Sequence, residues 1–233
     1  MRPLLSGESD ETSQLSREHA VARPVPGLVS IAGGKYTTYR VMAADAIDAA
    51  VADLPHPPGP SVTDQVPLVG ADGYAALVNQ TESIAGRYGL PGWRVLHLLD
   101  RYGSLVTEVL DAALDEPTLL EAMPGADTYL AAEVRYGATH EGALHLDDLL
   151  ARRTRISIET PHRGTDSAAA AAGLVADVLG WSDERLQAEV DVYLARVAAE
   201  RASQAEPTDQ AADAVRLVAP DTRRVGVGRA LDD

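Results

Sequence analysis

The stretch GLVSIAGGKYTTYRVMAADAID, residues 27–48, joins an apolar run, a pair of glycines and a helical pattern. The apolar run has the length of one strand, so residues 28–32 are predicted to form a short buried strand. Gly33 and Gly34 break this run, because glycine lets the backbone turn sharply and approach a ligand closely. The stretch therefore predicts a unit of strand, two-glycine turn and helix.

The helix that follows the glycines is predicted to span residues 37–54. Thr37 or Thr38 can cap its first turn, and apolar residues recur at helical spacing at Val41, Ala44, Ile47, Val51 and Leu54. A helix start after glycines offers free N–H groups and partial positive charge to an anion, and Lys35 adds a full charge there. These residues alone leave both an anion site and a plain structural turn open.

The composition indicates a protein rich in helix with a core that contains few aromatic side chains. The chain has 233 residues, of which 45% are hydrophobic, yet it contains no Phe and only 4% aromatic residues. Leu, Val, Ile and Ala are therefore expected to fill the interior, and abundant alanine favours helix. The absence of Cys excludes disulfides, thiolate metal sites and a cysteine nucleophile.

The charge balance argues against nucleic acid as a partner. A net charge of −15 opposes binding to phosphate backbones, which requires clustered cations. No apolar run approaches the roughly 18 residues of a transmembrane helix, and the first residues show no apolar segment of signal-peptide length. The sequence predicts a cytoplasmic protein.

The chain divides into four predicted segments. Residues 1–54 hold the glycine turn, residues 55–64 (PHPPGPSVTD) form a linker, residues 65–201 form a helical domain and residues 202–233 form a flexible tail. The helices expected in the helical domain are Tyr74–Tyr88, Gly92–Tyr102, Leu105–Leu114, Thr128–Glu141, Asp147–Arg153, Ser167–Leu179 and Asp183–Arg201.

Other groups of polar residues point to structure rather than to chemistry. His140 and His145 are five residues apart, which is not the HExxH zinc spacing, so no metal site is predicted. The basic run ARRTRIS at 151–157 is expected to pair with acidic neighbours such as Glu133 or Glu141 rather than to bind a ligand. Neither a Gly-x-Ser-x-Gly motif nor a P-loop is present.

Four strings together resemble one family of enzymes. They are RPLL at 2–5, LSREHAV at 15–21, GGKYTTYRVMAADAID at 33–48 and DDLLARRTRI at 147–156. In order and spacing, residues 1–200 resemble the carboxyl-terminal part of FAD-dependent glycerol-3-phosphate dehydrogenases. The resemblance implies a mainly α fold, in which a helical carboxyl-terminal domain follows the remnant of an α/β FAD-binding domain at residues 1–54.

The resemblance also implies the roles of particular residues. Arg2 would hold glycerol 3-phosphate near the flavin, and Arg17 would clamp its phosphate through the two charge-assisted bonds that a guanidinium can form. Lys35 would serve as substrate ligand and catalytic residue, orienting or polarising the reacting end. The cofactor-binding residues would be Gly33, Gly34, Lys35, Tyr36 and Thr37, whose backbone N–H groups would stabilise negative charge on the reduced flavin.

One departure from the family is the lack of a strand–GxGxxG–helix unit, which holds the FAD pyrophosphate in full members. The sequence is therefore expected to be an incomplete, carboxyl-terminal part of such an enzyme, from a truncated, mis-started or split gene. Residues 1–36 are expected to be loosely held, the strand at 28–32 to lack a partner, and the isolated chain not to bind FAD tightly. A second chain carrying the flavin domain is an expected partner.

Three readings of function follow. The first is a flavin dehydrogenase that converts glycerol 3-phosphate to dihydroxyacetone phosphate and passes electrons to a quinone or another acceptor. The second is a non-catalytic helical module that interacts with or stabilises a partner. The third is a related FAD-dependent oxidase of amino or hydroxy acids, over which the two arginines favour the phosphate substrate. The family also admits a peripheral position at the inner face of the plasma membrane.

Overall fold

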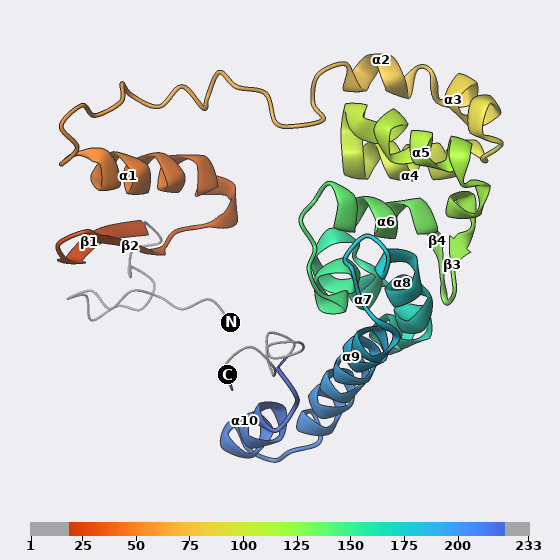
Figure 1. Ribbon diagram of the computed structural model, residues 1–233. Coiled ribbons are helices and arrows are strands. Elements are labelled where there is room, and N and C mark those ends of the chain that lie inside the picture. Colours follow the sequence, from red (N-terminus) through yellow and green to blue (C-terminus); the bar gives the residue numbers. More distant parts are fainter. Residues whose placement is uncertain (1–18, 222–233) are drawn as a thin grey trace. The chain divides into compact units, whose positions relative to one another are not determined.

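The computed structural model describes residues 19–221, which divide between Val69 and Gly70 into two compact units. Figure 1 shows a small amino-terminal unit with a hairpin and one long helix, and a larger unit built almost entirely of helices. The predicted fold class, mainly α with a strand–Gly-Gly–helix piece before a helical domain, is confirmed.

The amino-terminal unit contains a two-stranded antiparallel hairpin and a helix. Strand β1 is His19–Val25 and strand β2 is Leu28–Gly33; a short 3-10 turn, η1, at Tyr36–Thr38 leads into helix α1, Tyr39–Val51. In the hairpin Val25 pairs with Leu28, so Pro26 and Gly27 form a two-residue turn, with Gly27 at φ 82°.

Two expectations for this unit are wrong. The strand at 28–32 does have a partner, because β1 pairs with it antiparallel from His19 to Val25. It is also not buried: Leu28 is 51% and Ile31 is 38% exposed, and no residue from 19 to 69 is buried. The sequence conceals β1 because Pro24 interrupts it, at a β-bulge where no ladder N–H is needed.

The helical unit starts with four α-helices joined by short connections. They are α2 (Tyr74–Val78), α3 (Thr81–Tyr88), α4 (Gly92–Tyr102) and α5 (Val106–Asp115), with the 3-10 turn η2 (Gly103–Leu105) between the last two. The predicted helix Tyr74–Tyr88 is therefore two helices. The Thr81 hydroxyl donates to the carbonyl of Val78 at 2.7 Å and supports the break between them.

A second hairpin separates these helices from the rest of the unit. After the 3-10 turn η3 (Pro117–Leu120), strand β3 (Ala122–Met123) pairs antiparallel with β4 (Ala126–Leu130), and helix α6 (Ala131–Thr139) follows directly. The predicted helix Thr128–Glu141 is wrong at its start, because Tyr129 and Leu130 belong to β4. Both are buried, and a short buried strand looks like a buried helix in sequence.

The remaining elements follow in order along the chain. They are the π-helix η4 (Asp148–Arg153), α7 (Ile156–Glu159), the 3-10 segment η5 (Pro161–Ser167), α8 (Ala168–Val175), α9 (Asp183–Ser203) and α10 (Asp209–Leu217). Ser182 caps α9, since its hydroxyl oxygen accepts the N–H of Arg185 at 3.3 Å.

Helix α10 lies inside the segment predicted as a flexible tail, so that prediction is wrong for residues 209–217. Thr208 caps α10 by accepting the N–H of Ala211 at 3.2 Å, and Ala212 is buried as the helix packs against α9 (Figure 1). The sequence gives little sign of this helix, because its one buried side chain is an alanine, which adds little to an apolar pattern.

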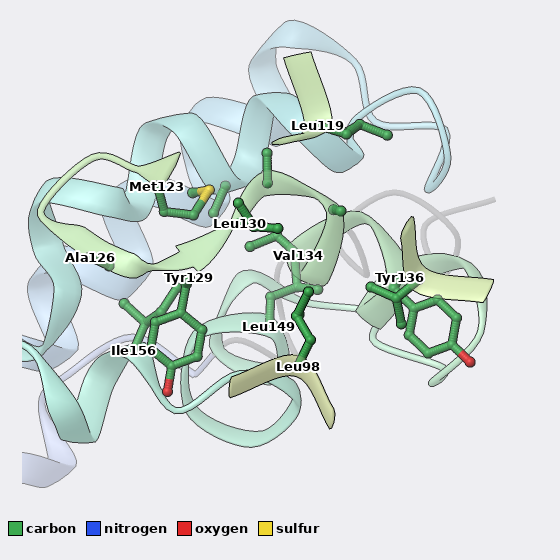
Figure 2. Close-up of a cluster of buried hydrophobic side chains, with 14 of the residues drawn as sticks. Leu98, Leu119, Met123, Ala126, Tyr129, Leu130, Val134, Tyr136, Leu149 and Ile156 are labelled. Atoms are coloured by element: carbon green, nitrogen blue, oxygen red, sulfur yellow. The ribbon is translucent and has the colours of Figure 1, made fainter. Parts of the chain in front are cut away.

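One hydrophobic core fills the helical unit (Figure 2). Side chains from α4, β4, α6, η4 and α7 meet there, including Leu98, Tyr129, Leu130, Val134, Leu149 and Ile156, all at most 1% exposed. The expectation that Leu, Val, Ile and Ala fill the interior holds, with an addition. Five tyrosines are also buried, and their hydroxyls donate to polar groups: Tyr88, Tyr102, Tyr129, Tyr136 and Tyr193.

Candidate functional site

The two-glycine turn between β2 and α1 requires glycine for two physical reasons. Gly33 has φ 80° and Gly34 has φ 74°, a left-handed backbone that side chains disfavour. A Cβ on Gly34 would also lie 2.5 Å from the sulfur of Met42 and 3.2 Å from the Cβ of His19. The turn therefore brings the backbone against α1 and β1 more closely than any other residue type would allow.

Hydrogen bonds between Lys35 and Thr38 close the turn and start the helix. The Thr38 hydroxyl oxygen accepts the N–H of Lys35 at 3.2 Å and its hydroxyl donates to the Lys35 carbonyl at 2.9 Å. The N–H of Thr38 donates to the same carbonyl at 3.0 Å. Tyr36 and Thr37 are the first residues of the helical segment, where N–H groups have no acceptor within a helix. All four side chains are exposed.

Ion pairs to α1 fix the hairpin beside this turn. His19 Nε2 lies 2.6 Å from a carboxylate oxygen of Asp45, and Arg23 Nη1 lies 2.6 Å from one of Asp53. Arg23 also donates to the carbonyl of Ala49. The sequence reasoning missed these contacts. A signal exists, because residues 45 and 49 lie on one face of α1 and residue 53 follows at the same spacing just after its end, but it can be read only once β1 is recognised.

The structure brings some of the predicted site residues together. Gly33, Gly34, Lys35, Tyr36 and Thr37 form one continuous turn at the amino-terminal side of α1, with Lys35 on its exposed surface. Arg2 and Arg17, the predicted substrate ligands, lie outside the described residues. The roles of all seven residues in catalysis or binding stay predictions.

A buried polar network lies in the helical unit, centred on Glu133 of α6. Its side chain is fully buried; one oxygen accepts the N–H of Leu130 at 3.0 Å, and the other lies 3.0 Å from Arg101 Nε and 3.4 Å from His97 Nε2. Burial raises the pKa of the nearby Glu141, although Arg153 opposes this shift. These groups hold α4, α6 and η4 together.

The arginines of the basic run at 151–157 form contacts within the fold, as predicted, although not with all the expected partners. Arg153 Nε donates to the backbone carbonyl of Glu141 at 2.7 Å, whereas Glu133 pairs with Arg101. Arg152 pairs with Asp147 and Asp148. Arg155 pairs with Glu159 at 3.3 Å, so each arginine of the run has an acidic or carbonyl partner.

The histidines named in the sequence lie apart from one another. His140 stacks on Tyr136 with ring centroids 4.5 Å apart, while His145 binds Glu189 through Nδ1 at 2.9 Å. Among residues 19–221, no cluster of three or more histidine and carboxylate side chains is arranged to hold a metal ion. Nor does any helix in that range have the length and apolar character needed to cross a membrane.

Comparison with known proteins gives a consistent picture. Residues 61–186 match the family model described as the C-terminal domain of alpha-glycerophosphate oxidase. The chain is 60% identical over 223 residues to glycerol-3-phosphate dehydrogenase of Mycobacterium leprae and, to the same extent, to glycerol-3-phosphate dehydrogenase 2 of Mycobacterium tuberculosis. A mitochondrial glycerol-3-phosphate dehydrogenase of Arabidopsis thaliana is 35% identical over 208 residues.

The matches cover most of this chain but only a smaller part of each relative. The mycobacterial matches take in 96% of this chain but only 38% of each relative, and the plant match takes in 82% of this chain and 32% of the relative. The chain thus spans well under half the length of the relatives that it matches.

Proposed function

Because the chain belongs to the family of the C-terminal domain of alpha-glycerophosphate oxidase, we propose that it works as part of an FAD-dependent glycerol-3-phosphate dehydrogenase. Glycerol 3-phosphate is oxidised to dihydroxyacetone phosphate, and a quinone or another acceptor takes the electrons. The observation that carries this proposal is the 60% identity to two dehydrogenases across 96% of the chain. That range includes both the glycine turn and the helical unit.

The amino-terminal unit supports the proposal by its incomplete burial. Residues 19–69 form one α-helix and two strands, and none of these residues is buried. Helix α1 is apolar on two sides: Met42 packs toward the turn, while Val41 and Ile47 are 57% and 58% exposed. A two-stranded hairpin with one helix is too small to be stable alone. We propose that the flavin-binding part of the enzyme covers these surfaces.

The residues of the turn fit a flavin on structural grounds. Gly34 packs against Met42 and His19, which fixes the path of the turn, and Tyr36 and Thr37 carry N–H groups at a helix start. The flavin, when bound, supplies the hydride acceptor. The helix start would offer partial positive charge to the reduced ring, and Lys35 would add a full charge toward the substrate. Arg2 and Arg17 are the proposed phosphate ligands.

The test joins this chain to the amino-terminal part of the Mycobacterium leprae relative, in place of the matching carboxyl-terminal segment. We expect the joined protein to bind FAD and to reduce dichlorophenolindophenol only when glycerol 3-phosphate is present. A protein that folds and binds FAD but leaves glycerol 3-phosphate unreacted would contradict the proposal. Amino and hydroxy acids, assayed in parallel, test the substrate class.

Lys35 can be tested separately because it is the only lysine in the sequence. In the joined protein, Lys35→Ala should lower kcat/KM by about 100-fold, the cost of removing one preorganised charge partner, and leave FAD bound. Arg155→Ala, which removes an exposed cation of the helical unit, is the control and should have little effect. In the joined protein, reductive methylation, read by mass spectrometry at the peptide that contains Lys35, should slow when glycerol 3-phosphate is present, with the terminal amine as internal reference.

A further inference from the structure

A cavity of about 610 Å³ lies in the helical unit where η4, α9 and the end of α10 come together. Three arginines from three different elements line it: Arg152 of η4, Arg196 of α9 and Arg216 of α10. Three aspartates line the same cavity, so its arginines and carboxylates are equal in number. We refer to it as the α9–α10 cavity.

The carboxylates at the cavity hold the arginines in place. Asp147, only 14% exposed, accepts from Nη1 of Arg152 and lies 3.4 Å from Nη1 of Arg196. Asp148 accepts from Arg152 and from two backbone N–H groups at 3.1 and 3.2 Å. Asp221 also lines the cavity. A guanidinium has five N–H donors, so arginines positioned through Nη1 can present further donors to a ligand.

A buried carboxylate orients a fourth polar group. Glu189 is fully buried and binds His145 Nδ1 at 2.9 Å, the N–H of Leu146 at 3.0 Å and Arg185 Nη2 at 2.7 Å. Because the carboxylate engages Nδ1, Nε2 is the ring nitrogen of His145 that a ligand can use. His145 is a lining residue of the cavity, so its ring adds a polar group to the three guanidinium groups.

We propose that the α9–α10 cavity binds a phosphate group, with Arg152, Arg196, Arg216 and His145 as its ligands. Donors that reach one cavity from several elements suit a tetrahedral anion better than a planar carboxylate. The volume exceeds that of the bare ion, so the natural ligand is a phosphate monoester, either a soluble metabolite or a lipid headgroup. Its binding also ties α10 to α9 and η4, since Arg216 is carried by α10.

The test uses the full 233-residue chain with inorganic phosphate as the probe. Isothermal titration calorimetry, with chloride at equal ionic strength as reference, should show saturable binding at one site. Arg152→Gln, Arg196→Gln or Arg216→Gln should each weaken that binding tenfold or more. Within residues 19–221, Arg216 pairs with the exposed Asp213, so its replacement keeps the test valid if the other variants unfold. Amide exchange in residues 209–217 should slow on binding.

The matched control is Arg155→Gln, from the same basic run as Arg152 but 60% exposed and paired with Glu159 away from the cavity. It should bind phosphate as the unmodified chain does. Absence of saturable binding, or equal weakening in the control and in Arg152→Gln, would overturn the proposal. Sedimentation with phosphatidylcholine vesicles, with and without phosphatidic acid, separates the two sources of phosphate. Binding that requires phosphatidic acid and is abolished in Arg152→Gln supports a lipid headgroup. Binding of inorganic phosphate without any binding to these vesicles supports a soluble ester.

Discussion

Glu133 is a charged side chain with no exposure to solvent, and the cations around it compensate for the burial of its charge. Replacing it with glutamine keeps an acceptor for the N–H of Leu130 but removes the negative charge that faces Arg101 at 3.0 Å. Leaving a buried cation without its partner costs about 3 kcal/mol. We therefore expect Glu133→Gln to lower the free energy of unfolding by about that amount, measured by urea denaturation followed by circular dichroism.

Glu121→Gln serves as the matched control, because Glu121 is an exposed carboxylate of the same unit. A surface change of this kind should alter the free energy of unfolding by no more than about 0.5 kcal/mol. If the two variants unfold at the same urea concentration as the unmodified chain, the Glu133 network does not stabilise the fold.

The buried tyrosines make a separate prediction about alkaline pH. Burial, together with Asp111 and Glu108 respectively, raises the pKa of Tyr88 and Tyr136 to about 12, and burial and Asp147 raise that of Tyr193 to about 12. These phenols bind their protons more tightly in the folded state than in the unfolded one, where the pKa is about 10. Their stabilising contribution is complete below pH 10 and is lost between pH 10 and 12.

We expect phenolate absorbance at 295 nm from these residues to rise near pH 12, together with loss of helical circular dichroism. In Tyr88→Phe, one step of that late absorbance should be missing. Full ionisation of all eight tyrosines by pH 10.5, with the helical signal intact, would show that the three hydroxyls are not held as the structure describes.

At the scale of elements, the bounds of a helix were predicted best where the sequence carries clear signals for its start and its end. Helix Gly92–Tyr102 has its predicted bounds because Pro91 precedes it and Gly103 ends it with φ 57°. Both hairpins were missed, although each turns on a Pro-Gly pair, at 26–27 and 124–125. Their strands have two to seven residues, and their pairing depends on partners that local periodicity does not reveal.

The candidate site was predictable in part for the same reason. Its glycines and Lys35 are visible in sequence, since a broken strand followed by a helical period marks the turn. The contacts that shape the turn are not visible. They come from Met42 one helical turn into α1, from His19 on a strand interrupted by proline, and from Asp45, which no local pattern pairs with His19.

The junction of β2 and α1 allows a direct test of this geometry. Gly34→Ala would place a Cβ 2.5 Å from the Met42 sulfur on a backbone with φ 74°, which should destabilise the unit by roughly 2 kcal/mol. In the joined protein, hydrogen exchange of the α1 amides should become faster. Gly59→Ala is the control, because a Cβ there meets nothing within 4 Å. Equal exchange in both variants would show that the close approach is unnecessary.

At the scale of the whole molecule, the two units differ sharply in burial. Residues 70–221 enclose a core with many side chains at most 1% exposed, whereas residues 19–69 contain no buried side chain. Apolar residues such as Leu28, Ile47 and Leu68 are at least half exposed in the amino-terminal unit. The hydrophobic contribution to folding is roughly proportional to buried apolar area, so it is concentrated in the helical unit.

This difference predicts two exchange regimes in the isolated chain. Amides of residues 19–51 should exchange within minutes, while those of α4, α6 and α9 should be slower by a factor of at least about 1000, because core helices open only with global unfolding. Uniform protection along the chain would contradict the prediction. Joining the chain to the amino-terminal part of the mycobacterial relative should slow exchange at residues 19–51 and leave α4 unchanged. Protection gained there together with bound FAD would identify the exposed apolar faces of α1 and the hairpin as surfaces that the flavin-binding part covers.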